Sequence, residues 1–238
     1  FEQQMLMALY HRAARAIRTV DSHKILFLET SMGANMGVVS AIEPLQQPGG
    51  APDPSPAYAP HGYDLVVDTA SIANASAERV SLIFSRHGET ARRLGLPMLV
   101  GEWGAFNGLP GTLPAAWMVA RQFERELCSD TYWLYEPGLD HLPPFQAISR
   151  AYPERVAGTL QSYACDPTGG AFTCRWLETG VVRASSRFYL PAWTGWPSRR
   201  IHLDPTGSGF TIEPGGDGNA WVSVEPLDEQ AVRILSVE

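Results

Sequence analysis

Apolar runs and helical patterns alternate along the first two-thirds of this 238-residue chain. The apolar runs, which have the character of buried strands, cover residues 25–29, 58–61, 97–102 and 131–136. Apolar residues recur at helical spacing in residues 2–20, 71–94, 113–127 and 147–156. The strands start about 35 residues apart, which is the length of one strand–helix unit of a parallel sheet. Four such units predict an α/β fold that makes up half of an eight-stranded barrel.

Half a barrel leaves both edges of its sheet open. Four parallel strands alone would expose two long apolar edges, which promote aggregation. The chain also starts at Phe1 inside a helical pattern, without an initiator methionine. We therefore expect residues 1–158 to be the C-terminal half of a (β/α)8 TIM barrel, and the N-terminal half to be supplied by the same or by a cleaved chain.

Short alternating runs replace this pattern after about residue 158. They cover residues 159–164, 171–177, 187–190, 199–203, 209–212, 220–224 and 232–237. Turns rich in Pro, Gly and Asp separate them, and short strands at this spacing are typical of an antiparallel β-sandwich. We therefore expect residues 159–238 to form a small β-sandwich domain, either a binding module or a packing partner of the barrel.

Composition argues against several functions. The net charge is −7 and the 18 Lys and Arg residues are scattered, whereas nucleic-acid binding needs clustered cations. No apolar run reaches the roughly 18 residues that a membrane helix needs. No cysteine or histidine pair has the spacing of zinc ligands. We expect no nucleic-acid partner, no metal and no cofactor.

The three cysteines leave the redox environment open. Cys165 and Cys174 lie in the β-rich region, where they either bridge neighbouring strands or pack as reduced thiols. A disulfide would indicate an oxidising compartment. Cys128, at the end of a predicted helix, is expected to be a buried thiol.

Residues 98–104 read Met-Leu-Val-Gly-Glu-Trp-Gly, a short apolar run that ends in a glutamate with glycines close by. Parallel α/β barrels present catalytic groups at the carboxyl ends of their strands. Glycines allow close approach of backbone and substrate, and the indole of Trp103 offers a flat apolar face. Glu102 is therefore a candidate nucleophile or acid/base of a sugar-cleaving enzyme. The alternative is a surface glutamate in an ordinary turn.

Polar and aromatic residues also follow the other predicted strands. They are Glu29 and Asn35 after the first strand, His61 and Tyr63 after the second, and Trp133 and Glu136 at the end of the fourth. Strand ends of a barrel meet at one mouth, so we expect these side chains to converge with Glu102. Aromatic faces stack on sugar rings, and carboxylates supply acids, bases or nucleophiles. The alternatives are a strand-end cap for His61, packing for Tyr63 and barrel core for Trp133.

Three motifs in this order and spacing resemble the later half of glycoside hydrolase family 5. They are His-Gly-Tyr at 61–63, Gly-Glu-Trp-Gly at 101–104 and Tyr-Trp at 132–133. Further segments narrow the resemblance to the endoglycoceramidase branch: Asn-Met-Gly at 35–37, Tyr-Ala-Pro-His-Gly-Tyr at 58–63 and Tyr-Pro-Glu-Arg-Val-Ala-Gly at 152–158. The resemblance spans nearly the whole chain.

The resemblance implies a retaining enzyme that cleaves the β-glycosidic bond between an oligosaccharide and ceramide. By position, Glu102 corresponds to the nucleophile, supported by His61 and Tyr63, and Trp133 to a sugar-stacking platform. Asn35, Trp103 and Glu136 are interpreted as further substrate-binding residues. The expected partner is a glycosphingolipid or another β-glycoside, reached through transient contact with a membrane surface. A secreted, cell-surface or periplasmic location is expected.

One part of the family pattern is missing from this sequence. Retaining hydrolysis needs a second carboxyl group about 5–5.5 Å from the first. In the family this acid/base lies in an Asn-Glu-Pro motif, and no Asn-Glu pair occurs in the 238 residues. We expect the acid/base upstream of Phe1, and this chain alone to be inactive. The alternatives are another family 5 β-glycosidase, acting on β-glucan or glucosylceramide, and a non-catalytic glycolipid-binding barrel remnant.

Two segments flank the predicted mouth of the barrel. Residues 30–56 form a Gly/Pro-rich loop that is too long for an ordinary connection, which predicts a functional or mobile segment. Residues 139–145 carry further apolar side chains. Our hypothesis is that both segments help to form an apolar slot for ceramide, with ordinary loop packing as the alternative.

Overall fold

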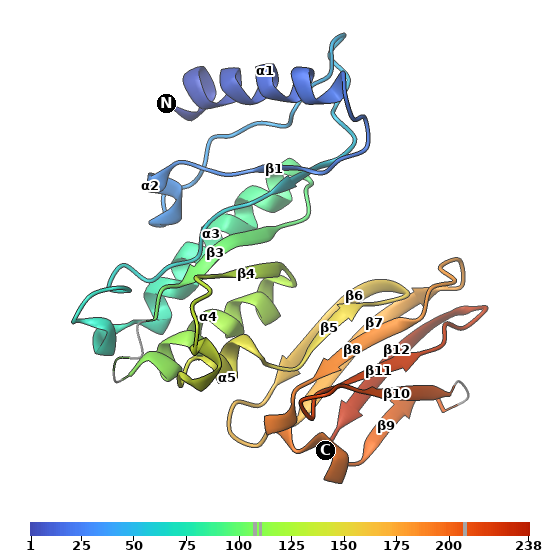
Figure 1. Ribbon diagram of the computed structural model, residues 1–238. Helices are drawn as coiled ribbons and strands as arrows, with labels where there is room; N and C mark the ends of the chain where they lie inside the picture. Colours follow the sequence, from blue (N-terminus) through green and yellow to red (C-terminus); the bar gives the residue numbers. More distant parts are fainter. Residues whose placement is uncertain (107–108, 110, 207–208) are drawn as a thin grey trace. The chain divides into compact units, whose positions relative to one another are not determined.

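The computed structural model describes residues 1–106, 109, 111–206 and 209–238 (Figure 1). The chain divides into two compact units, Phe1–Leu139 and Asp140–Glu238. The division lies between the predicted strand 131–136 and the predicted helix 147–156, before the domain boundary predicted at residue 158. Each unit has its own sheets and its own core.

Four short strands of the first unit run parallel and follow one another in chain order. They are β1 (Leu26–Leu28), β2 (Pro56–Tyr58), β3 (Leu99–Gly104) and β4 (Ser129–Trp133). Parallel pairing joins β1 to β2 and β3 to β4. Isolated parallel bridges, Tyr58 with Met98 and His61 with Glu102, connect the two pairs. This arrangement agrees with the predicted half of a parallel α/β barrel.

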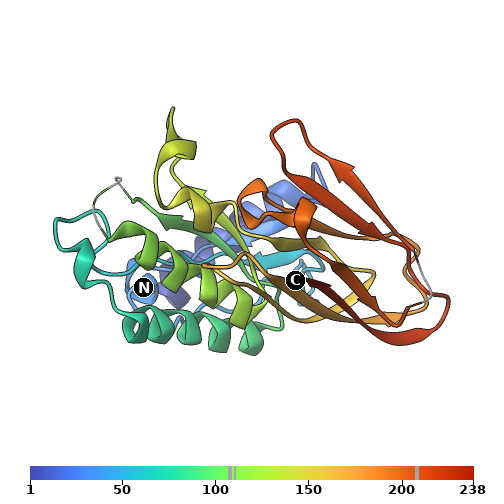
Figure 2. The same ribbon diagram turned by 90° about the horizontal axis from the view of Figure 1, so that it is seen from below.

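Helices alternate with these strands. They are η1 (Glu2–Leu6), α1 (Met7–Arg18), α2 (Met32–Asn35), η2 (Ile72–Asn74), α3 (Ala77–Leu94) and α4 (Thr112–Glu126). The side chain of Ser76 caps the N-terminus of α3, and Gly95 ends the helix in the left-handed conformation. The long helices α3 and α4 run side by side (Figures 1 and 2) and pack through Phe84 and Phe123, whose ring centroids lie 5.5 Å apart.

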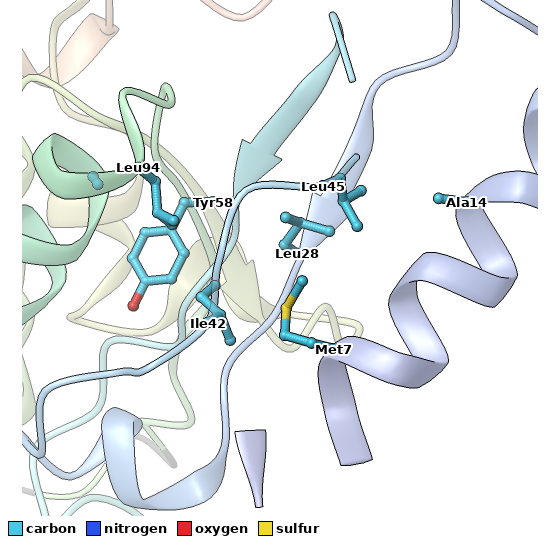
Figure 3. Packing of buried hydrophobic residues seen from close by; sticks show 8 residues of the cluster. Met7, Ala14, Leu28, Ile42, Leu45, Tyr58 and Leu94 are labelled. Carbon is cyan, nitrogen blue, oxygen red and sulfur yellow. The ribbon is translucent and has the colours of Figure 1, made fainter. Parts of the chain in front are cut away.

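One face of β1 and β2 packs against α1 and the loop that follows β1. Figure 3 shows this cluster, in which Leu28 and Tyr58 come from the strands, Met7 from α1 and Ile42 from the loop. Side chains alternate across a strand, so Phe27 points to the opposite face, where it is 53% exposed. An apolar residue on that face is what the inward-facing side of a barrel strand requires.

Residues 30–56 are tied to the rest of the first unit by charged side chains. The buried carboxylate of Glu2 accepts hydrogen bonds from the hydroxyls of Ser31 and Ser40. Although burial opposes it, these bonds and those from backbone amides hold the pKa of Glu2 below its usual range. Arg18 also donates two hydrogen bonds of 2.8 Å to Asp53. The loop is therefore anchored at its start, its middle and its end.

The second unit consists of two four-stranded antiparallel sheets, with strand orders β10-β11-β8-β5 and β6-β7-β12-β9. Their strands are β5 (Tyr152–Arg155), β6 (Gly158–Cys165), β7 (Phe172–Thr179), β8 (Ser186–Leu190), β9 (Ile201–Asp204), β10 (Phe210–Pro214), β11 (Ala220–Val224) and β12 (Gln230–Val237). Phe188 of one sheet contacts Phe172 and Trp176 of the other, so the sheets face each other as the predicted β-sandwich.

The helix predicted over residues 147–156 is wrong. The helix α5 (Phe145–Ile148) spans four residues, and the chain then forms β5. Pro153 lies inside β5 and pairs with Phe188 of β8. Because β5 is an edge strand, a proline without an N–H group is tolerated there, whereas it would break a helix interior.

All three cysteines are buried thiols. Cys165 and Cys174 lie on the neighbouring strands β6 and β7 but face other partners, Phe172 and Tyr163 respectively. Of the two alternatives for this pair, the structure has the packed, reduced one. Burial raises the pKa of Cys174 to about 12, so this thiol is not reactive at neutral pH.

Within the described ranges, no helix has the length and apolar character needed to cross a bilayer.

Replacing Phe188 with Ala should lower the free energy of unfolding by about 3–5 kcal/mol, because it removes a fully buried ring between the two sheets. Urea titration followed by tryptophan fluorescence measures the change. Phe210→Ala is the matched control, since Phe210 is partly exposed on β10 of the same sandwich and its loss should cost less than about 1 kcal/mol. Equal losses would mean that Phe188 does not hold the sheets together.

Candidate active site

Glu102 lies at a β-bulge in β3. The pairing of β3 with β4 shifts between Val100 and Trp103, where β3 carries one more residue than β4. The hydroxyl of Thr131 on β4 donates to the carbonyl of Gly101 at 2.5 Å and holds the bulge. A bulge bends the strand and redirects a side chain. Val100 and Trp103 are fully buried on either side, whereas the Glu102 side chain stays 32% exposed.

The strand end after Glu102 depends on a glycine and an indole. Gly104 has φ +110°, and a Cβ at this position would lie 2.2 Å from the ring of Tyr132. Only glycine fits there. The Trp103 indole donates to Asp130 at 2.8 Å and packs edge-on against Tyr132. Buried Trp103 is thus an anchor beneath the site, and its indole offers no exposed face to a sugar.

His61 and Tyr63 both meet one oxygen of Glu102. The Tyr63 hydroxyl donates to Oε2 of Glu102 at 3.0 Å, and Nδ1 of His61 lies 3.4 Å from the same oxygen. The backbone holds the two strand ends together, since the Gly62 amide donates to the Glu102 carbonyl at 2.8 Å. The structure therefore brings these three predicted residues together, with both contacts on Oε2 of Glu102.

Tyr63 is a hydrogen-bond donor in this arrangement. Burial, together with the neighbouring Glu102 carboxylate, raises the pKa of Tyr63 well above its usual range. The phenol therefore keeps its proton and donates it to Oε2. A donor fixed on one oxygen orients the carboxylate and stabilises its charged form.

Asn35, at the end of α2, and Glu29, just after β1, both contact His61. The side-chain oxygen of buried Asn35 accepts the His61 backbone amide at 3.0 Å. Asn35 was predicted to bind substrate, and this bond gives it a structural task at the site. Glu29 places Oε1 3.2 Å from Nε2 of His61, so a carboxylate oxygen lies near each ring nitrogen.

His87 is a site residue that the sequence interpretation missed. It lies on α3, 1% exposed, and its Nε2 is 3.0 Å from the His61 carbonyl while Nδ1 is 3.1 Å from the Tyr58 hydroxyl. Burial lowers the pKa of His87 to about 4, so the ring is neutral. Since a carbonyl only accepts, Nε2 carries the proton and Nδ1 accepts from Tyr58. In the sequence, His87 lies within a predicted helix, and nothing in that position marks it as a site residue.

Trp133 and Glu136 lie at and beyond the end of β4. The Trp133 side chain is 48% exposed, as a stacking platform requires, and its peptide bond to Leu134 is cis. Glu136 is exposed, and its negative charge adds to the effect of burial in raising the pKa of Tyr132. The contacts that link His61, Tyr63 and Glu102 do not extend to Glu136.

In the part of the chain that the structure describes, no group of three or more His, Cys, Asp or Glu residues is arranged to hold a metal ion.

The site lies at a strand end of a parallel half-barrel. It combines an oriented carboxylate with a histidine, a phenol and an exposed tryptophan, which is the arrangement of a glycosidase-like site. The family model of the cellulases (glycosyl hydrolase family 5) matches residues 2–138. The chain belongs to glycosyl hydrolase family 5.

Solved structures of similar fold include endo-glycoceramidase II from Rhodococcus sp. Its complex with cellobiose-like isofagomine has a TM-score of 0.78 and 23% identity, covering 99% of this chain and 54% of that one. Its complex with ganglioside GM3 has a TM-score of 0.78 and 22% identity. Sterylglucosidase 1 from Cryptococcus neoformans has a TM-score of 0.70 and 13% identity, covering 99% of this chain and 44% of that one. No curated protein matches significantly.

This chain spans about half the length of the endo-glycoceramidase structures. At these identities the similarity establishes the fold, and it extends over both units of the chain. The half-barrel and the β-sandwich therefore occur together in larger proteins of known structure.

Neutral His87 should make the protein less stable in acid. Its folded pKa of about 4 lies below the ordinary 6.5, so the unfolded chain binds more protons between these values. Stability should fall as pH drops from about 6.5 to about 4, by up to about 3 kcal/mol from this group.

His87→Gln should remove this part of the acid sensitivity, as measured by urea midpoints across the range. His141→Gln is the control, because the His141 side chain is 83% exposed. An unchanged pH dependence in His87→Gln would show that His87 is not the group responsible.

Proposed function

We propose that this chain carries the nucleophile half of the active site of a retaining β-glycoside hydrolase. The observation that carries the proposal is the asymmetric environment of Glu102: Tyr63 and His61 both contact Oε2. Retaining glycosidases need a carboxylate that attacks the sugar and is held in place while it does so. Oε1 of Glu102 is the attacking oxygen in this assignment.

The reaction then runs in two displacements. Oε1 of Glu102 forms a bond to the anomeric carbon while the bond to the leaving oxygen breaks and that oxygen takes a proton. The carboxylate becomes an ester, and Oε2 becomes its carbonyl oxygen. Water then attacks the anomeric carbon and gives a proton to the group that protonated the leaving oxygen, while the electron pair of the ester bond returns to Glu102. Donors on Oε2 stabilise the carboxylate both before attack and as it leaves.

The proton for the leaving oxygen requires a second carboxyl group. No Asn-Glu pair occurs in the 238 residues, and the solved structures of similar fold are about twice as long. We assign the acid/base to the other half of the barrel, in the same or in a cleaved chain. That half would also cover the open apolar face on which Phe27 lies.

For the substrate we propose a sugar linked to a lipid, with the oligosaccharide–ceramide bond of a glycosphingolipid as the bond that is cut. Trp133 offers an exposed face for a sugar ring. The segment around Asn35 exposes apolar side chains next to the site, with Met32 72% and Val38 63% exposed. A ganglioside complex of endo-glycoceramidase II and a sterylglucosidase are both among the structures of similar fold.

Glu102→Gln should lower kcat on a β-glycoside by about 10³-fold or more, because an amide cannot form the glycosyl ester. A mechanism-based fluoroglycoside should label Glu102 in the parent enzyme, as mapped by peptide mass spectrometry. Glu89→Gln, an exposed glutamate of α3, is the control and should keep full activity. A label on another residue would refute the assignment.

Met32→Ser combined with Val38→Ser should lower kcat/KM on a glycosphingolipid about tenfold, through lost apolar contact with the lipid. Turnover of a soluble aryl glycoside should change less than about twofold. Val181→Ser, at an exposed apolar position in the second unit, should change neither rate. Equal losses on both substrates would contradict the lipid-binding role.

A further inference from the structure

We propose that Glu29 is a positioning residue that acts through His61, keeping its imidazole in the doubly protonated form that faces the nucleophile. This inference rests on the proposed function of Glu102. Glu29 lies outside the motifs that carry the family resemblance. It follows β1, whereas His61 follows β2 and Glu102 belongs to β3.

The end of β1 holds Glu29 in a defined position. The Tyr10 hydroxyl on α1 donates to the Glu29 carbonyl at 2.8 Å, which fixes the backbone just after the strand. The Glu29 side chain extends to His61, with Oε1 3.2 Å from Nε2. Its side chain is 51% exposed and therefore remains accessible to water on one side.

Each ring nitrogen of His61 lies beside a carboxylate oxygen. Nε2 lies near Glu29 and Nδ1 near Glu102, so a lone pair on either nitrogen would face a negative oxygen. Protons on both nitrogens turn both contacts into attractive ones.

The other ionisable groups near His61 add no charge of their own. Tyr63 packs edge-on with its ring centroid 6.2 Å away, and its phenol stays protonated. His87 contacts the His61 carbonyl as a neutral ring. The charge balance at His61 is therefore set by Glu29 and Glu102.

The two carboxylates are not equivalent during the reaction. When Oε1 of Glu102 bonds to the anomeric carbon, Glu102 becomes a neutral ester and loses its negative charge. Glu29 is then the remaining counter-ion of His61. With Glu29 in place, Nδ1–H still faces Oε2 when the ester bond breaks and the electron pair returns to Glu102. The contribution of Glu29 therefore falls mainly on the second displacement.

The test compares Glu29→Gln with Glu43→Gln in the enzyme at its natural length. Glu43 is an exposed glutamate of the loop over residues 30–56 and is bonded to Gln3, so it controls for the lost charge. The substrate is an aryl β-glycoside with a good leaving group, for which the second displacement limits turnover. Glu29→Gln should lower kcat about tenfold and lower KM with it, as the glycosyl-enzyme accumulates. Glu43→Gln should match the parent.

The second readout does not depend on turnover. Imidazole ¹⁵N spectra near neutral pH should show both His61 nitrogens protonated in the parent and in Glu43→Gln, and a neutral ring in Glu29→Gln. An unchanged His61 spectrum in Glu29→Gln overturns the proposal. A changed spectrum with an unchanged kcat would also overturn the proposal, because Glu29 would then have no positioning role in the reaction. If no β-glycoside is cleaved and Glu102 is not labelled, the proposed function fails, whatever the spectra show.

Discussion

The bulge in β3 is the constraint on which the site depends. One additional residue opposite β4 turns the Glu102 carboxylate out of the buried layer while Val100 and Trp103 stay inside it. The indole of Trp103, bonded to Asp130, fixes the strand from below, and the absence of a side chain at Gly104 admits the Tyr132 ring. Apolar packing and hydrogen bonding thus hold a polar group at an exposed edge.

The residues around Glu102 form successive layers of support. Tyr63 and His61 contact the carboxylate directly. Asn35 and His87 hold the backbone of His61 through its amide and its carbonyl. These supports come from three segments of the first unit, namely α2, α3 and the stretch after β2. The position of one oxygen therefore depends on tertiary packing rather than on local sequence.

Periodicity and strand-end position were sufficient to predict much of this arrangement. The spacing of apolar runs gave the parallel strands, and the motifs gave Glu102, His61 and Tyr63. They could not reveal His87, because a buried histidine in an amphipathic helix has the same sequence pattern as any core residue. They also assigned Trp103 to the substrate, since a pattern of residue types does not show which side of a bulge an indole takes. The helix predicted over 147–156 failed because Pro153 was treated as an interruption of a helix rather than as an edge-strand residue.

Pro153 has a consequence for how the second unit behaves among other proteins. Open sheet edges recruit further strands, and β5 is such an edge. Its proline lacks an N–H group, and the pairing register shifts immediately after it. An incoming strand would meet an interrupted row of donors along β5. Pro153 therefore disfavours the addition of a further strand to β5, which protects the β-rich domain from edge-to-edge polymerisation at this side.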